Sequence, residues 1–137
     1  MYVGKLRSNV LGSEYRLVEP GVANETRIYY ESRVFSDADD LGPCRRMRVS
    51  LPNGSDLKSV EPEWVGGQYT LDFGSSVAIM ASVKNFIISD SNNGTVMKMY
   101  KLSKNEFFIQ VTPGEMLLPV QVFAIALSSI DRKICTQ

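Results

Sequence analysis

The segment LPVQVFAIALSSIDRKI, residues 118–134, is the most informative part of this chain for its architecture. It predicts a helix, because Pro119 suits a first helical turn and Arg132 and Lys133 suit the last. Between residues 120 and 127 it leaves almost no polar stripe, and a helix that is apolar on every side is typically buried on every side. The rest of the chain must therefore supply the surface that covers it.

That remainder predicts short strands separated by turn residues, because its segments are rich in β-branched and aromatic side chains. We expect strands within residues 2–12, 13–19, 26–35, 44–51, 68–73, 79–90, 95–101 and 106–112. Residues 92–94 and 102–105 are good hairpin connections, so about eight strands should pair mostly with antiparallel neighbours. Residues 53–64 contain no predicted strand.

Two arrangements of sheet and helix fit this pattern. A curved or closed antiparallel sheet can wrap around residues 118–134, which also removes free strand edges. Alternatively, the helix can pack flat on one sheet face, the commoner arrangement in α+β domains. Because Ala124 and Ala126 are small enough for tight enclosure, we predict a mostly β, α+β domain in which a barrel-like sheet surrounds a central C-terminal helix.

Composition limits the chemistry. The 137 residues suit one domain over 1–137, and 15 basic residues balance 15 acidic ones, so any anion site must be local. Histidine is absent, which removes the usual general base and the commonest metal ligand. Cys44 and Cys135 lie outside any C-x-x-C pattern and predict reduced thiols rather than a zinc site. We expect no enzyme activity, no metal and no cofactor.

Targeting signals are also absent from the pattern. MYVGKLRSN, residues 1–9, has no apolar region typical of a signal peptide, and the longest apolar run, residues 116–127, is shorter than the roughly 20 residues of a membrane span. A cytoplasmic location is therefore expected.

GKLRSN, residues 4–9, places two cations at alternate positions. In an extended strand Lys5 and Arg7 point to the same face. The planar fork of arginine and the mobile point charge of lysine together suit vicinal phosphates. Taken alone, such a pair more often indicates a solvated edge strand that is protected by charge.

Several stretches resemble, in the same order, the signature segments of the C-terminal domain of tubby and tubby-like proteins. They are YVGKLRSNVLGSEY, YYE followed by GPCRRM, QYTLDF, ASVKNF and QVFAIALSSIDRK. The resemblance implies a closed antiparallel barrel around one hydrophobic helix. It also implies binding to phosphoinositides with adjacent 4- and 5-phosphates, chiefly phosphatidylinositol 4,5-bisphosphate, in which the positions of Lys5 and Arg7 grip the headgroup.

Some features depart from the family pattern. The chain begins almost at GKLRSN, so the preceding strand, which contributes a polar headgroup contact in relatives, has no counterpart, and an incomplete, shortened barrel is expected. A third family cation falls near Val22, and Arg27 is its substitute here. Lys84, inside ASVKNF, is a further candidate, with a structural role as the equal alternative. A helical stretch of the family is reduced to residues 53–64.

The densest basic cluster comprises Arg45, Arg46 and Arg48. It either widens a membrane-facing patch or pairs at the surface with the acidic residues of 37–40, and surface pairing is the commoner outcome for such clusters.

The sequence thus predicts a non-enzymatic phosphoinositide-binding module, peripheral at the inner plasma membrane, with Lys5 and Arg7 as principal ligands and Arg27 and Lys84 as lesser ones. The partner is the headgroup, with a membrane-protein cargo or other protein partner, and the chain is expected to be monomeric. The alternatives are a protein-interaction or adaptor domain with a degenerate lipid site, or a nuclear role in transcription through DNA binding. A neutral chain has few residues with which to build a basic groove for nucleic acid.

Overall fold

The computed structural model describes residues 3–33, 44–66, 68–74, 78–80, 82, 84–114 and 116–131. Its elements in chain order are β1 (Lys5–Ser8), β2 (Glu14–Val18), β3 (Thr26–Arg33), β4 (Cys44–Ser50), β5 (Asp56–Ser59), β6 (Glu63–Val65), β7 (Gln68–Thr70), β8 (Phe86–Ser89), β9 (Thr95–Ser103), β10 (Glu106–Val111) and α1 (Pro119–Ile130). Eight strands form one sheet in the order β1-β2-β3-β4-β5-β8-β9-β10, and β6 and β7 form a separate pair. Every pairing among these strands is antiparallel.

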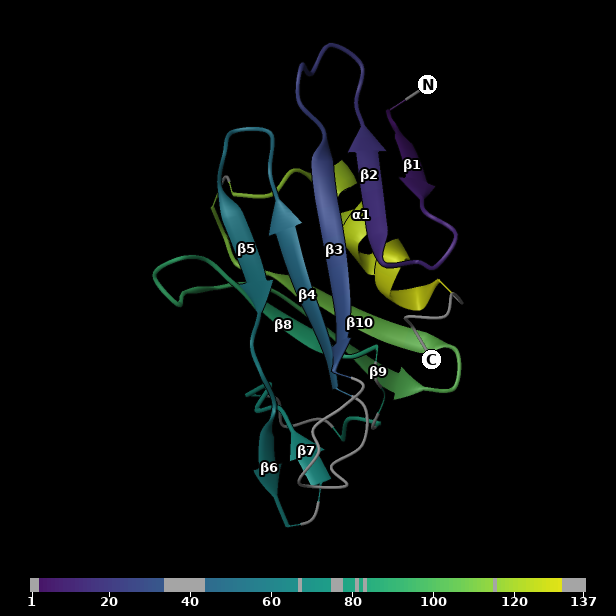
Figure 1. Cartoon of the computed structure of the whole chain (residues 1–137). Helices are drawn as coiled ribbons and strands as arrows, with labels where there is room; N and C mark the ends of the chain where they lie inside the picture. The colour runs from purple at the N-terminus through teal and green to yellow at the C-terminus, as the bar shows by residue number, and fades with distance from the viewer. Residues whose placement is uncertain are drawn as a thin grey trace.

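The strands β2, β3 and β4 each have a buried face and a solvent face, because apolar and polar residues alternate along them. The buried apolar positions are Tyr15, Leu17, Ile28, Tyr30, Met47 and Val49. One core cluster joins most of these side chains with residues of β5, β8, β9 and α1. In Figure 1, α1 lies behind β2 and β3, while β8, β9 and β10 cross the direction of β3 and β4. The sheet therefore wraps around the helix.

Buried hydrogen bonds hold α1 against β3 at two points. Near the start of the helix, the Gln121 side-chain oxygen accepts the Leu118 backbone N–H at 2.8 Å, and its Nε2 donates to Thr26 Oγ1 at 3.4 Å. Near its end, the Tyr30 hydroxyl and Ser128 Oγ lie 2.7 Å apart. Polar groups in a core are tolerated when they are hydrogen-bonded in this way. These contacts therefore fix the position of α1 relative to β3.

The prediction that the helix is enclosed on every side is wrong. Phe123 is 64% exposed and Leu127 is 42% exposed. Phe123 lies in a hollow with Ile109 of β10, and Leu127 lies in another with Leu6 of β1. The exposed stripe thus lies between the two end strands of the sheet. The expected incomplete barrel around a hydrophobic helix is confirmed, with its opening between β1 and β10.

Three boundaries differ from the predictions. Residues 53–64 include β5 and the start of β6, and Leu57 of β5 is only 1% exposed. Of the strand expected over 79–90, the structure shows β8 and an isolated bridge between Met80 and Lys101, and residues 81 and 83 lie outside the described part of the chain. Between these two pieces the Asn85 side-chain oxygen accepts the Lys101 N–H at 2.8 Å in place of a ladder bond. The helix ends at Ile130, whereas 134 was predicted, and residues 132–134 lie outside the described part of the chain.

Candidate functional site

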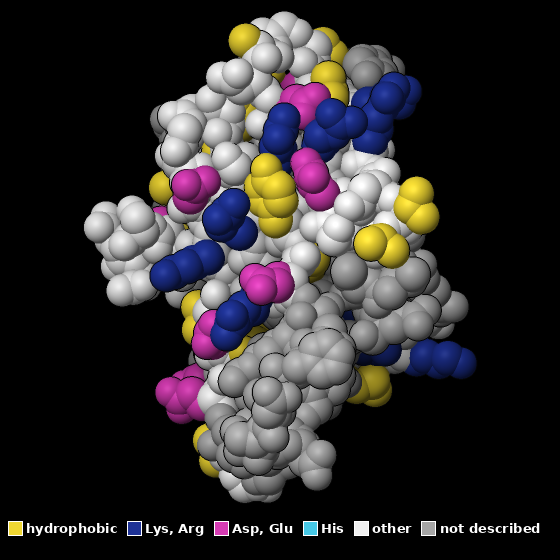
Figure 2. Space-filling model, viewed as in Figure 1, with side chains coloured by type: hydrophobic (Ala, Val, Ile, Leu, Met, Phe, Trp, Pro, Cys, Tyr) yellow, Lys and Arg dark blue, Asp and Glu magenta, His cyan; other side chains and the backbone are white. Residues whose placement is uncertain are grey.

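The outer face of β1, β2 and β3 carries three arginines in one cross-strand row. Arg7 lies opposite Arg16, and Arg16 lies opposite Arg27. Lys5 stands two residues before Arg7 and shares its face. We call these four residues the arginine row. Figure 2 shows Lys and Arg side chains gathered over these strands, near the top of the view.

The turn between β1 and β2 sets the register that makes this row. The Asn9 side-chain oxygen accepts the backbone N–H groups of Ser13 and Glu14, at 2.9 and 3.2 Å. The Asn9 backbone N–H donates to the Glu14 carbonyl at 3.0 Å, and Gly12 adopts a positive φ of 70°. A shift of one residue would turn the cations toward the core, so this turn determines where Arg7 points.

Glu25 forms the ion pairs that moderate the repulsion within the row. Glu25 Oε1 lies 3.8 Å from Arg16 Nη1, and its Oε2 lies 3.6 Å from Arg27 Nε. The ion pairs found among the described residues include neither Lys5 nor Arg7. Like charges placed directly opposite one another on a sheet are destabilising. Glu14 lies on the same face two residues before Arg16 and also acts on the charge of Arg27. Four cations against these two carboxylates leave this surface positive, and an anion would reduce the repulsion.

Arg27 is additionally held by its neighbour on the strand. Its side chain makes a hydrogen bond with Tyr29, and this bond, followed by the charge interaction with Tyr29, raises the pKa of Arg27 above its ordinary value. The guanidinium stays charged at any working pH, so the positive surface does not depend on titration.

The row has dimensions that suit a polyanion. Two strand spacings separate Arg7 from Arg27, a distance of about 10 Å along the row. Each guanidinium offers a planar fork of donors, and such forks bind phosphate oxygens in pairs. The arrangement can therefore hold two neighbouring phosphate groups at once.

The structure brings together three of the predicted site residues, Lys5, Arg7 and Arg27, and leaves the fourth apart. Lys84 precedes β8, which is three strands from β3 in the sheet order, and its backbone carbonyl accepts the Ser129 hydroxyl of α1 at 2.9 Å. Sequence analysis missed Arg16. Its signal was the alternation in residues 14–18, which places Arg16 on the face opposite the buried Tyr15.

The second basic cluster lies on the same outer face, over β4. Arg46 Nε lies 2.8 Å from Glu61 Oε1, and Arg48 Cζ lies 5.2 Å from the centre of the Tyr29 ring. The predicted pairing with residues 37–40 falls outside the described residues. Within the part that the structure describes, three or more potential metal ligands gather nowhere, and no helix has the length and apolarity to cross a membrane.

Comparison with known proteins agrees with these observations. A model of the Tub family matches residues 46–132. Mouse Tubby-related protein 2 is 30% identical over 179 residues, which cover 97% of this chain and 31% of that protein. Human Tubby-related protein 1 is 30% identical over 183 residues, which cover 99% of this chain and 33% of that protein. This chain spans about a third of the length of the curated relatives it matches. The aligned region is longer than the 137 residues here, so the relatives carry additional residues within it.

Proposed function

Because this chain belongs to the Tub family, we propose that it is a tubby-like domain that binds a phosphoinositide headgroup through the arginine row. The observation that carries this proposal is the register that places Arg7, Arg16 and Arg27 side by side, with Lys5 beside them. The ligand proposed is phosphatidylinositol 4,5-bisphosphate, and the site acts by binding alone, without catalysis.

The vicinal phosphates of that headgroup suit the spacing of the row. Arg7 and Arg16 lie on neighbouring strands and can share one phosphate through their forks, while Arg27 reaches the second. Lys5 supplies a mobile charge next to Arg7. Such charge-assisted contacts weaken as salt screens them, because the Debye length falls from about 10 Å at 0.1 M to about 3 Å at 1 M salt.

The position of the row also orients the domain. The cations lie on the solvent face of the sheet, opposite the face that packs on α1, so a membrane can approach the row without disturbing the core. We propose that the domain sits peripherally on the cytoplasmic face of the plasma membrane, with the outer face of β1, β2 and β3 toward the lipid.

A second candidate is a protein-interaction domain that keeps the tubby core without lipid recognition. The exposed stripe of Phe123 and Leu127 favours it, because large exposed apolar side chains between two strand edges suit a protein partner. A folded chain that shows no preference among anionic lipids would support this candidate over the first.

The test is co-sedimentation with vesicles at physiological salt. Vesicles containing phosphatidylinositol 4,5-bisphosphate are compared with phosphatidylserine vesicles of equal surface charge, which separates headgroup recognition from general attraction. We expect selective binding by the natural chain, loss of selectivity in the double variant Lys5→Ala, Arg7→Ala, and no change in Lys104→Ala, an exposed lysine outside the row. Full selectivity in the double variant would contradict the proposal.

A further inference from the structure

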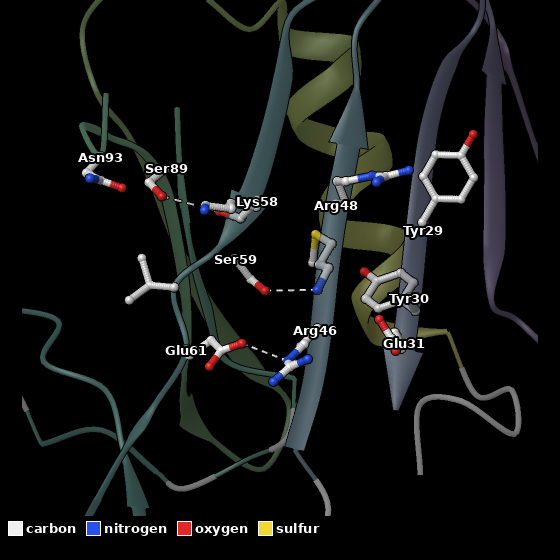
Figure 3. Close-up of a pocket in the computed structure, with 12 residues that line it drawn as sticks. Tyr29, Tyr30, Glu31, Arg46, Arg48, Lys58, Ser59, Glu61, Ser89 and Asn93 are labelled. Carbon is white, nitrogen blue, oxygen red and sulfur yellow. Dashed lines mark hydrogen bonds and ion pairs between the residues drawn. The ribbon is translucent and has the colours of Figure 1, made fainter. Parts of the chain in front are cut away.

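A hollow over β3, β4 and β5 forms a second basic site that the proposed lipid site does not use. Tyr29, Arg48, Lys58 and Ser89 form one row across β3, β4, β5 and β8. They line a hollow of about 570 Å³ together with Glu31, Arg46 and Glu61 among others. Figure 3 shows these side chains around it. Ligand pockets for small molecules usually have about 300–1,000 Å³.

The two ends of this hollow differ in charge. At one end Arg48 lies directly opposite Lys58, and neither is in an ion pair found among the described residues. At the other end Arg46 is held by Glu61 at 2.8 Å and lies opposite Glu31. One end therefore carries two positive charges, and the other carries a net negative charge.

The cationic end carries two like charges that an anion would neutralise. Like charges directly opposite on neighbouring strands repel, and Figure 3 shows the Arg48 side chain turned toward Tyr29 and away from Lys58. The Tyr29 ring holds the Arg48 guanidinium, with Cζ 5.2 Å from its centre. Both cations are exposed, so their ends can turn toward a shared anion at small cost. A dianion between them would remove the repulsion.

The acidic end determines which chemical groups the rest of the ligand can carry. The carboxylates of Glu31 and Glu61 accept hydrogen bonds from hydroxyl groups and repel a second anion. Ser59 adds a donor, because its oxygen accepts the Met47 N–H at 2.9 Å and leaves the hydroxyl hydrogen available. The Tyr29 ring and the exposed Val60 supply apolar wall.

We infer that this hollow binds a small phosphomonoester whose body carries hydroxyl groups and no second charge, of the sugar-phosphate class. A phosphomonoester has about −1.5 to −2 charges at pH 7, which matches the two cations. The phosphate lies between Arg48 and Lys58, and the hydroxyl groups face Glu31 and Glu61. Polyphosphates are disfavoured here by the two carboxylates, unlike at the arginine row.

The experiment is a nuclear magnetic resonance titration of the full chain with glucose 6-phosphate. Glucose is the comparison probe that lacks the phosphate, and inositol 1,4,5-trisphosphate is the polyphosphate that this hollow should disfavour. We expect saturable shifts at the backbone amides of Arg48 and Lys58 with glucose 6-phosphate, and none with glucose. The double variant Arg48→Gln, Lys58→Gln should weaken this binding at least about tenfold, the usual scale for charge-assisted contacts. Lys104→Gln should leave it unchanged.

Shifts that are absent, that centre on the arginine row, or that persist at full affinity in the double variant would overturn the inference. The single variant Lys58→Gln replaces one exposed side chain and keeps the test valid if the double variant is unstable. Selective vesicle binding should survive Arg48→Gln, Lys58→Gln, so failure of this site is distinguishable from failure of the lipid site.

Discussion

The two faces of β2, β3 and β4 differ in what they contribute, although they come from the same strands. The inner face buries Tyr15, Ile28 and Val49 against α1. The outer face carries Arg16, Arg27 and other charges to solvent. Alternation along a strand therefore assigns core packing to one set of residues and the proposed recognition to the other, so we expect substitutions on the inner face to change stability and those on the outer face to change binding.

The largest expected effect is on the inner face. Ile28→Ala should lower the free energy of unfolding by about 2–5 kcal/mol, because Ile28 is 0% exposed and the cavity would lie in the middle of the core. Urea denaturation measures this loss. The vesicle selectivity of the folded fraction should not change. A loss of unfolding free energy below about 0.5 kcal/mol would contradict the account in which the inner face stabilises the fold.

A smaller effect is expected where the inner face is polar. Tyr30→Phe removes the hydroxyl that lies 2.7 Å from Ser128 Oγ and should cost about 1–2 kcal/mol of unfolding free energy. Tyr29→Phe, on the outer face, is the matched control and should cost less. Equal losses of unfolding free energy in the two variants would contradict the expectation that the inner-face tyrosine contributes more to stability than the outer-face tyrosine.

On the outer face, one substitution should strengthen binding. Glu25→Gln removes the carboxylate that lies 3.8 Å from Arg16 and 3.6 Å from Arg27. Affinity for phosphatidylinositol 4,5-bisphosphate vesicles should rise about two- to fivefold, the scale of exposed ion pairs. Flotation or co-sedimentation across a lipid series measures it. Weaker binding would show that Glu25 orders the arginines for the ligand instead of competing with it.

The smallest effect is expected at the opening of the sheet. Phe123→Ser should change the unfolding free energy by no more than about 0.5 kcal/mol, because the side chain is 64% exposed. Ile125→Ser, two residues along and 0% exposed, is the control and should be strongly destabilising. A large loss in Phe123→Ser would show that this side of the helix is covered after all.

Much of the fold was predictable because the alternation, turn residues and apolar runs of local sequence segments indicate most of its strands and its helix. The hairpin of β9 and β10 followed from alternation and turn residues, and the helix followed from Pro119 and its apolar run. The enclosure was not predictable, because an apolar stripe does not show where a sheet ends, and Phe123 lies at that end. β5 was missed since Leu57 is its one deeply buried side chain among turn residues.

The site was predictable only in part. Lys5 and Arg7 were found through a resemblance, and the alternation in GKLRSN put them on one face. Arg16 required the pairing of β1 with β2, and that register depends on turn hydrogen bonds of the Asn9 side chain, which alternation alone does not reveal. Periodicity gives the face of each residue, whereas register gives its neighbours on other strands.

The measurement that tests the central claim most directly is the affinity of Arg16→Gln for phosphatidylinositol 4,5-bisphosphate vesicles. Arg16 stands in the middle of the row, and only its register with Arg7 and Arg27 implicates it. We expect affinity at least about tenfold lower than in the natural chain and in Lys104→Gln, with unchanged thermal stability. Unchanged affinity in Arg16→Gln would contradict the arginine row as the headgroup site.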